Sequence, residues 1–348
     1  MKYRYNIYKF IITLLAVLLV ISNYNVADLH AESTSPKNST PTIENSLTKI
    51  ENQEKLYKPT DEVRIVVELK GQPGILHAQE SNKKYSELSA NTRHRLHQNS
   101  LNEQEQVKTL IQSSNISIEY IDNFTAVLNG FSGKVLYKDI EEIEKLDHVK
   151  AVYISEEYEQ PIEPIKEIKL SEFDQTEATT ANEIVNATKV WNDIGYRGEG
   201  KVVAVIDRGI DVEHQDMILS DDTVPGLGEA DVEKIVNEQG LKGKYYTEKV
   251  PYGYNYADEN DTIKNVGEGA NGHGIHVSGI VGANGDLDNG GIKGVAPEVQ
   301  ILGMKVFSND QVSSTNSDIY VKAIDDAVKL NVDAINMSFG SAGRILNP

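Results

Sequence analysis

The stretch that decides the fold is residues 271–284, which read NGHGIHVSGIVGAN. Its small residues lower the intrinsic helix propensity, so a helix here must be stabilised by close packing against neighbouring elements. His273 would lie on the first turn of that helix, where backbone N–H groups are unpaired and an imidazole can be directed out of the core. The pattern therefore predicts a buried helix that presents a catalytic base.

A short apolar run lies upstream of this stretch. Residues 201–206 read KVVAVI and are followed by Asp207. A β-branched run without polar alternation is typical of a parallel strand that is buried on both faces. Such a strand would carry Asp207 at its carboxyl end. An Asp in that place and a His on a later helix suggest two members of a Ser-His-Asp triad.

Four blocks in this order resemble the subtilisin family of serine endopeptidases, and more closely its lactocepin, or cell-envelope proteinase, type. The long segment between the first two blocks, with VPYGYNYAD at 250–258, carries the closer similarity. The four blocks are VIDRGID at 205–211, HGIHVSGI at 273–280, GVAP at 294–297 and VDAINMSFG at 332–340.

This resemblance implies a fold and a set of site residues. Residues 182–348 are expected to form part of a subtilisin-like three-layer α/β/α domain with a parallel sheet. Asp207 and His273 are expected to be catalytic. Backbone groups of the segment formed by Ser338, Phe339 and Gly340 are expected to bind an extended polypeptide substrate, with an ordinary strand end as the alternative.

The chain departs from the family pattern at several places. The family nucleophile lies in a Gly-Thr-Ser-Met-Ala-type segment, and an Asn contributes to the oxyanion hole, but neither is identified before Pro348. The chain alone is therefore expected not to hydrolyse peptides, because the covalent path needs the nucleophile. Arg208 stands where most relatives place Ser, Thr or Ala, and it could point either toward Asp207 or outward. His276 is expected to be structural rather than a metal ligand.

Composition restricts the partners and cofactors. The chain has 34 basic and 53 acidic residues, a net charge of −19, which argues against a nucleic-acid or anionic-membrane partner. It has no Cys, so disulfides and thiolate metal sites are excluded. No cofactor is required for the chemistry. By resemblance, Asp216 and the loop 284–290 could bind a structural Ca²⁺, although a polar Gly-rich turn is an equal alternative.

The N-terminal region carries an export signal. Lys2, Arg4 and Lys9 precede an apolar run over 10–21, which is too short to span a bilayer comfortably. We expect a signal peptide over 1–31, with an uncleaved anchor as the alternative, and no membrane association after cleavage. The predicted location is secreted or in the cell wall of a Gram-positive-type bacterium. A disordered spacer rich in Ser, Thr, Asn and Pro follows over 32–61.

Residues 62–160 are predicted to form a ferredoxin-like α+β domain, because their periodicities give a β-α-β-β-α-β order. Its position resembles that of the family's propeptide, which caps the active-site cleft in cis, and its acidic tail at 156–161 would lie toward that cleft. A linker over 161–181 is expected to contain the maturation cut. The predicted strands are 63–69, 116–120, 125–135 and 149–154; the predicted helices are 91–113, 137–146 and, in the next domain, 182–193 and 318–330. The last helix is expected to serve core packing through one apolar stripe, formed by Ile319, Ala323, Ile324, Ala327 and Leu330.

Three interpretations remain open at this point. The first is the precursor, or zymogen, of an exported subtilisin-like endopeptidase that cleaves extracellular polypeptides. The second is a secreted inhibitor or folding assistant in which residues 62–160 act in trans on another protease. The third is a partial gene product whose last residues, 343–348, leave the family pattern.

Overall fold

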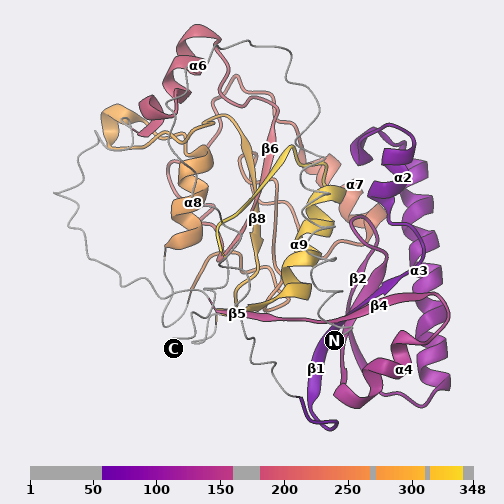
Figure 1. The fold of residues 1–348 in the computed structure, drawn as a ribbon. Coiled ribbons are helices and arrows are strands. Elements are labelled where there is room, and N and C mark those ends of the chain that lie inside the picture. Colours follow the sequence, from indigo (N-terminus) through magenta and orange to yellow (C-terminus); the bar gives the residue numbers. More distant parts are fainter. Residues whose placement is uncertain (1–56, 160–180, 267–271, 310–313, 340–348) are drawn as a thin grey trace, which may run out of the picture.

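The computed structural model describes residues 57–159, 181–266, 272–309 and 314–339. They form an N-terminal α/β domain that packs against a second domain built on a parallel sheet (Figure 1). The predicted signal peptide, most of the spacer and almost all of the linker lie outside these ranges. No helix within them is both long and apolar enough to cross a bilayer.

The N-terminal domain has a four-stranded antiparallel sheet in the order β2-β3-β1-β4, as a ferredoxin-like fold requires. Helices α3 and α4 cover one face of this sheet. Alternation in β1 separates the two faces: Ile65 and Val67 pack with the helices, whereas Val66 packs in a separate apolar cluster. The elements are β1 (Glu62–Leu69), α3 (Ala90–Ser113), β2 (Ile118–Phe124), β3 (Gly130–Leu136), α4 (Ile140–Glu144) and β4 (Val149–Ile154).

The strand predicted over 125–135 is wrong for its first five residues. Strand β2 continues to Phe124, and β3 begins only at Gly130. The backbone N–H groups of Thr125, Ala126 and Val127 instead donate to a carboxylate of the second domain, so they cannot join the ladder. Two short helices between β1 and α3 were not predicted: α2 (Gly74–Glu80) and η2 (Tyr85–Glu87).

The second domain has a parallel sheet in the order β10-β6-β8-β7. Helix α8 (His273–Gly282) lies on one face and α9 (Ser317–Lys329) on the other (Figure 1). In β6, Ala204 and Ile206 pack on the α9 side, whereas Val205 packs on the α8 side. This confirms the predicted layered α/β architecture. The strands are β6 (Val202–Asp207), β7 (Tyr252–Asn255), β8 (Gln300–Lys305) and β10 (Ala334–Met337).

The helix predicted over 182–193 is interrupted. Asn186 has a left-handed backbone with φ of 61°, a conformation that Asn tolerates better than most residues. Helix α6 (Ala187–Asp193) therefore starts anew after a helical turn at 181–184. Helix α7 (Glu229–Gln239) and the turn η5 (Leu287–Asn289) complete the described helices of this domain.

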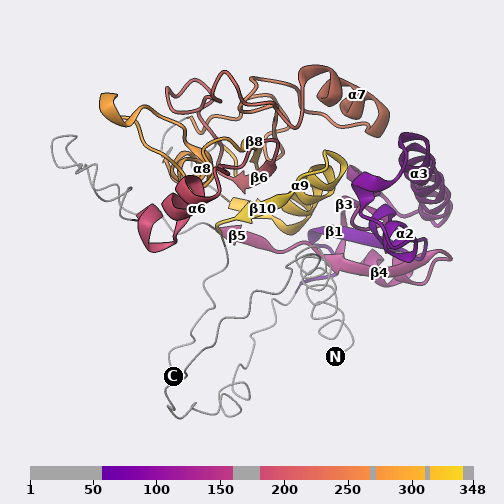
Figure 2. The same cartoon turned by 90° about the horizontal axis from the view of Figure 1, so that it is seen from above.

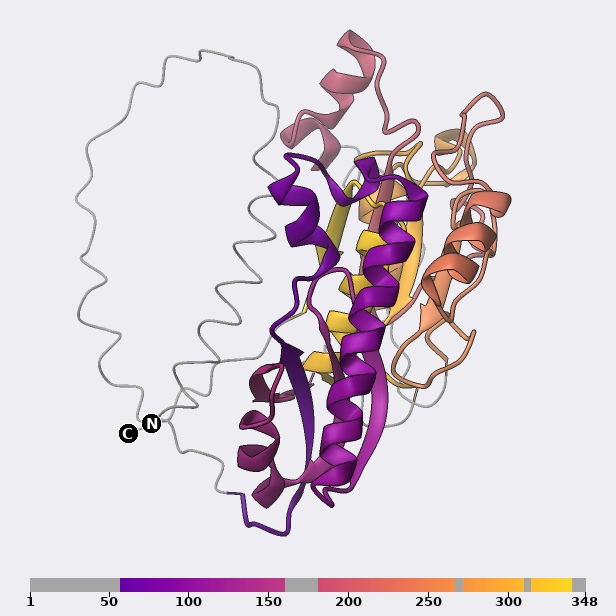
Figure 3. The same ribbon diagram turned by 90° about the vertical axis from the view of Figure 1, so that its right-hand side faces the viewer.

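Helix α9 connects the two domains because it is buried between their sheets (Figures 2 and 3). Its apolar stripe faces the parallel sheet, as predicted, with Ile319, Ala323 and Ala327 in the core. On its other side, Val321 packs in a cluster whose three further buried members come from the N-terminal domain: Val66, Phe124 and Leu128.

Candidate active site

The structure brings Asp207 and His273 into direct contact. Asp207 is the last residue of β6 and its side chain is 1% exposed, whereas His273 is the first residue of α8 and is 26% exposed. His273 Nδ1 lies 2.9 Å from Asp207 Oδ1. A buried carboxylate thus faces one ring nitrogen of a histidine that remains partly accessible, which is the arrangement expected for an orienting acid and a base.

Two glycines permit this approach. A Cβ atom at Gly274 would lie 2.2 Å from the carbonyl oxygen of Gly209, so only glycine lets the start of α8 meet the turn after Asp207. Gly209 itself has φ of 125°, a conformation that other residues rarely adopt. The small residues of the deciding stretch therefore have the packing role that the sequence predicted.

Arg208 is buried rather than directed into solvent. Its guanidinium carbon lies 5.6 Å from the centre of the Phe307 ring, and its backbone N–H donates to Asp207 Oδ1 at 2.7 Å. Burial lowers the pKa of Arg208, and the neighbouring Asp207 opposes that shift. Asp207 Oδ2 is buried and has no hydrogen-bond partner among the described residues.

Two of the three predicted substrate-binding residues lie at the end of β10. Ser338 is exposed, and its hydroxyl donates to the side chain of Asn336. The Phe339 ring packs edge-on against Phe307 at 5.3 Å and lies 5.8 Å from the Tyr320 ring. Gly340 lies outside the described residues. Substrate binding by this segment stays a prediction.

The acidic tail of the N-terminal domain pairs with the second domain. Strand β5 (Glu157–Glu159) is antiparallel to β9 (Ser314–Asn316), which leads directly into α9. The Tyr158 ring meets the Tyr320 ring edge-on at 5.8 Å. Sequence reasoning did not predict β9, because three residues without an apolar alternation give no strand signal.

Comparisons with known proteins agree with this geometry. The model described as "Subtilase family" matches residues 198–346, and the model described as "Peptidase inhibitor I9" matches residues 66–160. Residues 198–346 are a subtilase domain. An I9 domain precedes it, and the predicted resemblance to the subtilisin family is confirmed.

Individual relatives support the same assignment. The chain is 44% identical over 225 residues to the PI-type proteinase of Lactococcus lactis subsp. cremoris, an alignment that covers 63% of this chain and 11% of that protein. It is 36% identical over 151 residues to the C5a peptidase of Streptococcus pyogenes serotype M18, covering 42% and 13%. The chain thus matches only about a tenth of the length of these relatives.

A solved structure also aligns with the chain. The Epidermin Leader Peptide Processing Serine Protease (EpiP) from Staphylococcus aureus covers 81% of this chain, and the alignment covers 50% of that protein. The sequence identity is 16% and the TM-score is 0.42.

The sequence also singled out His276 as a structural residue and Asp216 as a possible metal ligand. His276 is exposed on α8. Asp216 is buried, and its Oδ2 accepts the backbone N–H of Ile292 at 3.1 Å, which closes the loop predicted to bind Ca²⁺. Within the described ranges, no three Asp, Glu or His side chains gather as a metal site would require. Calcium binding stays a prediction.

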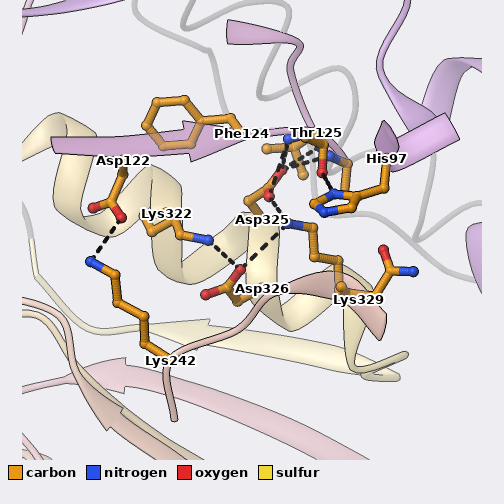
Figure 4. Close-up of polar contacts among 12 residues, drawn as sticks. His97, Asp122, Phe124, Thr125, Lys242, Lys322, Asp325, Asp326 and Lys329 are labelled. Carbon is orange, nitrogen blue, oxygen red and sulfur yellow. Dashed lines mark hydrogen bonds and ion pairs between the residues drawn. The ribbon is translucent and has the colours of Figure 1, made fainter. Parts of the chain in front are cut away.

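A buried charge cluster joins the I9 and subtilase domains at α9 (Figure 4). The Asp325 carboxylate accepts the backbone N–H groups of Ala126 and Val127 at 2.8 and 2.9 Å. Lys329 pairs with Asp325 at 2.8 Å, and one turn earlier Lys322 pairs with Asp326 at 2.6 Å. Burial opposes ionisation of Asp325, but the lysines and the donated N–H groups outweigh it and lower its pKa.

Sequence reasoning missed this cluster, although it left a signal. Helix α9 was predicted to serve core packing only. Yet it carries Lys322, Asp325, Asp326 and Lys329, with lysine-aspartate pairs at i,i+4 spacing in a helix that is otherwise largely apolar. These four charged residues, in addition to Asp318 in the first turn, indicate that the helix has a second buried face.

We predict that Asp325→Asn destabilises the chain by about 3–5 kcal/mol, because it leaves buried lysine charge without its counter-ion and weakens three backbone contacts. Urea unfolding followed by tryptophan fluorescence measures this change. Asp261→Asn is the matched control, because Asp261 forms an exposed ion pair with Lys244 and should cost no more than about 1 kcal/mol. Equal losses in both variants would contradict a special role for the Asp325 carboxylate.

His97 makes the same interface sensitive to acid. Its Nδ1 lies 2.9 Å from the Thr125 hydroxyl, and the ring is buried beside Lys329 (Figure 4). Burial, reinforced by the Lys329 charge, lowers the pKa of His97 to about 4. The folded pKa is below the unfolded value of 6.5, so the stability contribution is complete above pH 6.5 and is lost as the pH falls toward 4.

We predict that the free energy of unfolding of His97→Gln falls less than that of the parent chain between pH 7 and pH 4.5. The difference should be about 2 kcal/mol, because Gln retains a hydrogen-bonding side chain but does not titrate. Urea unfolding at the two pH values measures it. His276→Gln, at an exposed position, should behave like the parent chain. The prediction fails if His97→Gln and the parent lose equal stability.

Proposed function

We propose that this chain comes from the precursor of an exported serine endopeptidase that hydrolyses extracellular polypeptides. The observation that carries this proposal is the 2.9 Å contact between His273 Nδ1 and Asp207 Oδ1 within the subtilase domain. The apolar run over 10–21 supports export, and relatives from Lactococcus lactis and Streptococcus pyogenes support a Gram-positive-type source with a secreted or cell-wall location.

The pair can perform the acid–base part of serine hydrolysis. Because Nδ1 faces Asp207, the Nε2 atom of His273 is the nitrogen that would take the proton of a serine hydroxyl and later give it to the leaving amine. Asp207 would hold this tautomer and stabilise the imidazolium form. These steps need no cofactor, and we retain Ca²⁺ near Asp216 only as a proposed structural ion.

The I9 domain is proposed to act as the propeptide in cis. Strand β5 adds to β9 as an extended segment, which is also how a polypeptide substrate would pair with an exposed strand edge. The ring contacts from Tyr158 through Tyr320 to Phe339 join β5 to the proposed substrate segment at 338–340. In this proposal β5 occupies the place of substrate until the linker over 161–181 is cut.

We further propose that these 348 residues have no peptidase activity by themselves, because no nucleophile or oxyanion-hole block was identified among them. The purified chain should release no fragments from casein, and a serine-directed fluorophosphonate probe should not label it. Labelling together with hydrolysis that His273→Ala abolishes by 10³-fold or more would contradict this proposal and would show that a serine reaches His273.

A second candidate function is inhibition in trans, and the I9 match favours it. The I9 domain has an apolar core of its own, separate from that of the subtilase domain. A fragment covering 57–159 should then inhibit an active subtilisin-type protease in a casein assay. Deletion of β5 from this fragment should weaken inhibition at least about tenfold, because strand addition supplies main-chain hydrogen bonds. Hydrolysis at the uninhibited rate would eliminate this function.

A further inference from the structure

We propose that Lys305 is a positioning residue for the Asp207–His273 pair. Its buried side chain holds the backbone turn that carries Asp207. This inference rests on the proposed peptidase function, because an exact orientation of the Asp207 carboxylate matters only if His273 acts as a base. Lys305 would act through the turn and would not touch the reacting atoms.

The end of β8 holds two consecutive carbonyl groups of this turn. Lys305 is the register partner of Asp207 in the parallel β6–β8 pair. Its Nζ donates to the carbonyl oxygen of Arg208 at 2.7 Å, and the N–H of Val306 donates to the carbonyl oxygen of Asp207 at 2.9 Å. The two peptide planes that follow the Asp207 Cα are therefore held by two consecutive residues, the last residue of β8 and the one after it.

The Asp207 carboxylate depends on this backbone more than on its own side-chain contacts. Its two hydrogen bonds with described residues, from the Arg208 N–H and from His273, both reach the same oxygen, Oδ1. Oδ2 is buried with no hydrogen-bond partner among the described residues. A carboxylate held through one oxygen can rotate about that contact, so the direction of its Cα–Cβ bond must be set by the turn.

Burial of the Lys305 ammonium group is energetically unfavourable. Its side chain is fully buried, and burial lowers its pKa to about 8, although the carboxylates of Asp258 and Asp207 favour the charged form. The ammonium group faces the Arg208 carbonyl, the amide oxygen of Asn265 at 3.5 Å, and the nearby charge of Arg208, which disfavours it. An apolar side chain would fill a strand core at lower cost, so the donor atom is the feature that distinguishes Lys305.

A second buried lysine provides a matched control. Lys249 Nζ also donates to a backbone carbonyl oxygen, that of Pro297, at 2.6 Å, and burial lowers its pKa to about 7. Its side chain is 1% exposed, but its charged neighbours are Glu298 and Lys293 rather than Asp207. Replacing either lysine by Met removes a buried donor and its charge, but only one replacement affects the turn after Asp207.

The test is proton NMR of the whole chain, comparing Lys305→Met and Lys249→Met with the parent at one common pH. A proton between a histidine Nδ1 and a carboxylate resonates at low field, and His273→Ala assigns that signal. We expect Lys305→Met to lose or broaden the signal and Lys249→Met to retain it. A sharp, unshifted signal in Lys305→Met, or its loss in both variants, would overturn the proposal.

A rescue experiment covers the case in which Lys305→Met does not fold. The chain contains no cysteine, so Lys305→Cys can be alkylated specifically in denaturant with 2-bromoethylamine, which restores an amine at the end of a side chain of nearly the same length. Refolding should then restore the low-field signal, and refolding without that signal would refute the role of Lys305. Absence of the signal from the parent chain would refute the Asp207–His273 pairing itself, so the two failures are distinguishable.

Discussion

The burial of helix α9 on two sides is the constraint on which the arrangement of the two domains depends. One side packs on the parallel sheet, and the other meets the I9 domain through Val321 and the Asp325 carboxylate. A helix in this position has no water to solvate its charges, so each must find a partner inside the interface. The lysine-aspartate pairs at i,i+4 spacing meet this requirement and also give the I9 domain a fixed place to bind.

The same helix relates the interface to the candidate active site. Strand β9 leads into the N-terminus of α9 and pairs with β5. Arg64 and the Ser155 hydroxyl bind Asp318 in the first turn of α9. The opposite face of the sheet receives α8, whose first residue meets the end of β6. A shift of α9 would therefore change the position of β5, whereas the Asp207–His273 contact depends mainly on β6, β8 and α8.

The sequence was sufficient for features that depend on local pattern. The buried strand before Asp207, the glycine-rich helix at His273 and the β-α-β-β-α-β order all follow from periodicity and from the need for small residues. It was insufficient where a distant partner decides the structure. Residues 125–129 were predicted as the start of a strand because their partner Asp325 is about two hundred positions away in the sequence. The donor role of Lys305 depends on a strand register that periodicity does not specify.

The two domains supply unequal shares of the apolar residues in their interface. This inequality determines which domain exposes apolar surface after the two separate. Of the four buried residues in the apolar cluster, the I9 domain supplies Val66, Phe124 and Leu128, and α9 supplies only Val321. The subtilase side also presents the Asp325 carboxylate, which binds the I9 backbone, and its partner Lys329, and water can solvate both charges after separation. The detached I9 domain would therefore expose most of this apolar cluster and would be the more prone to associate, while the subtilase domain would keep a more polar surface.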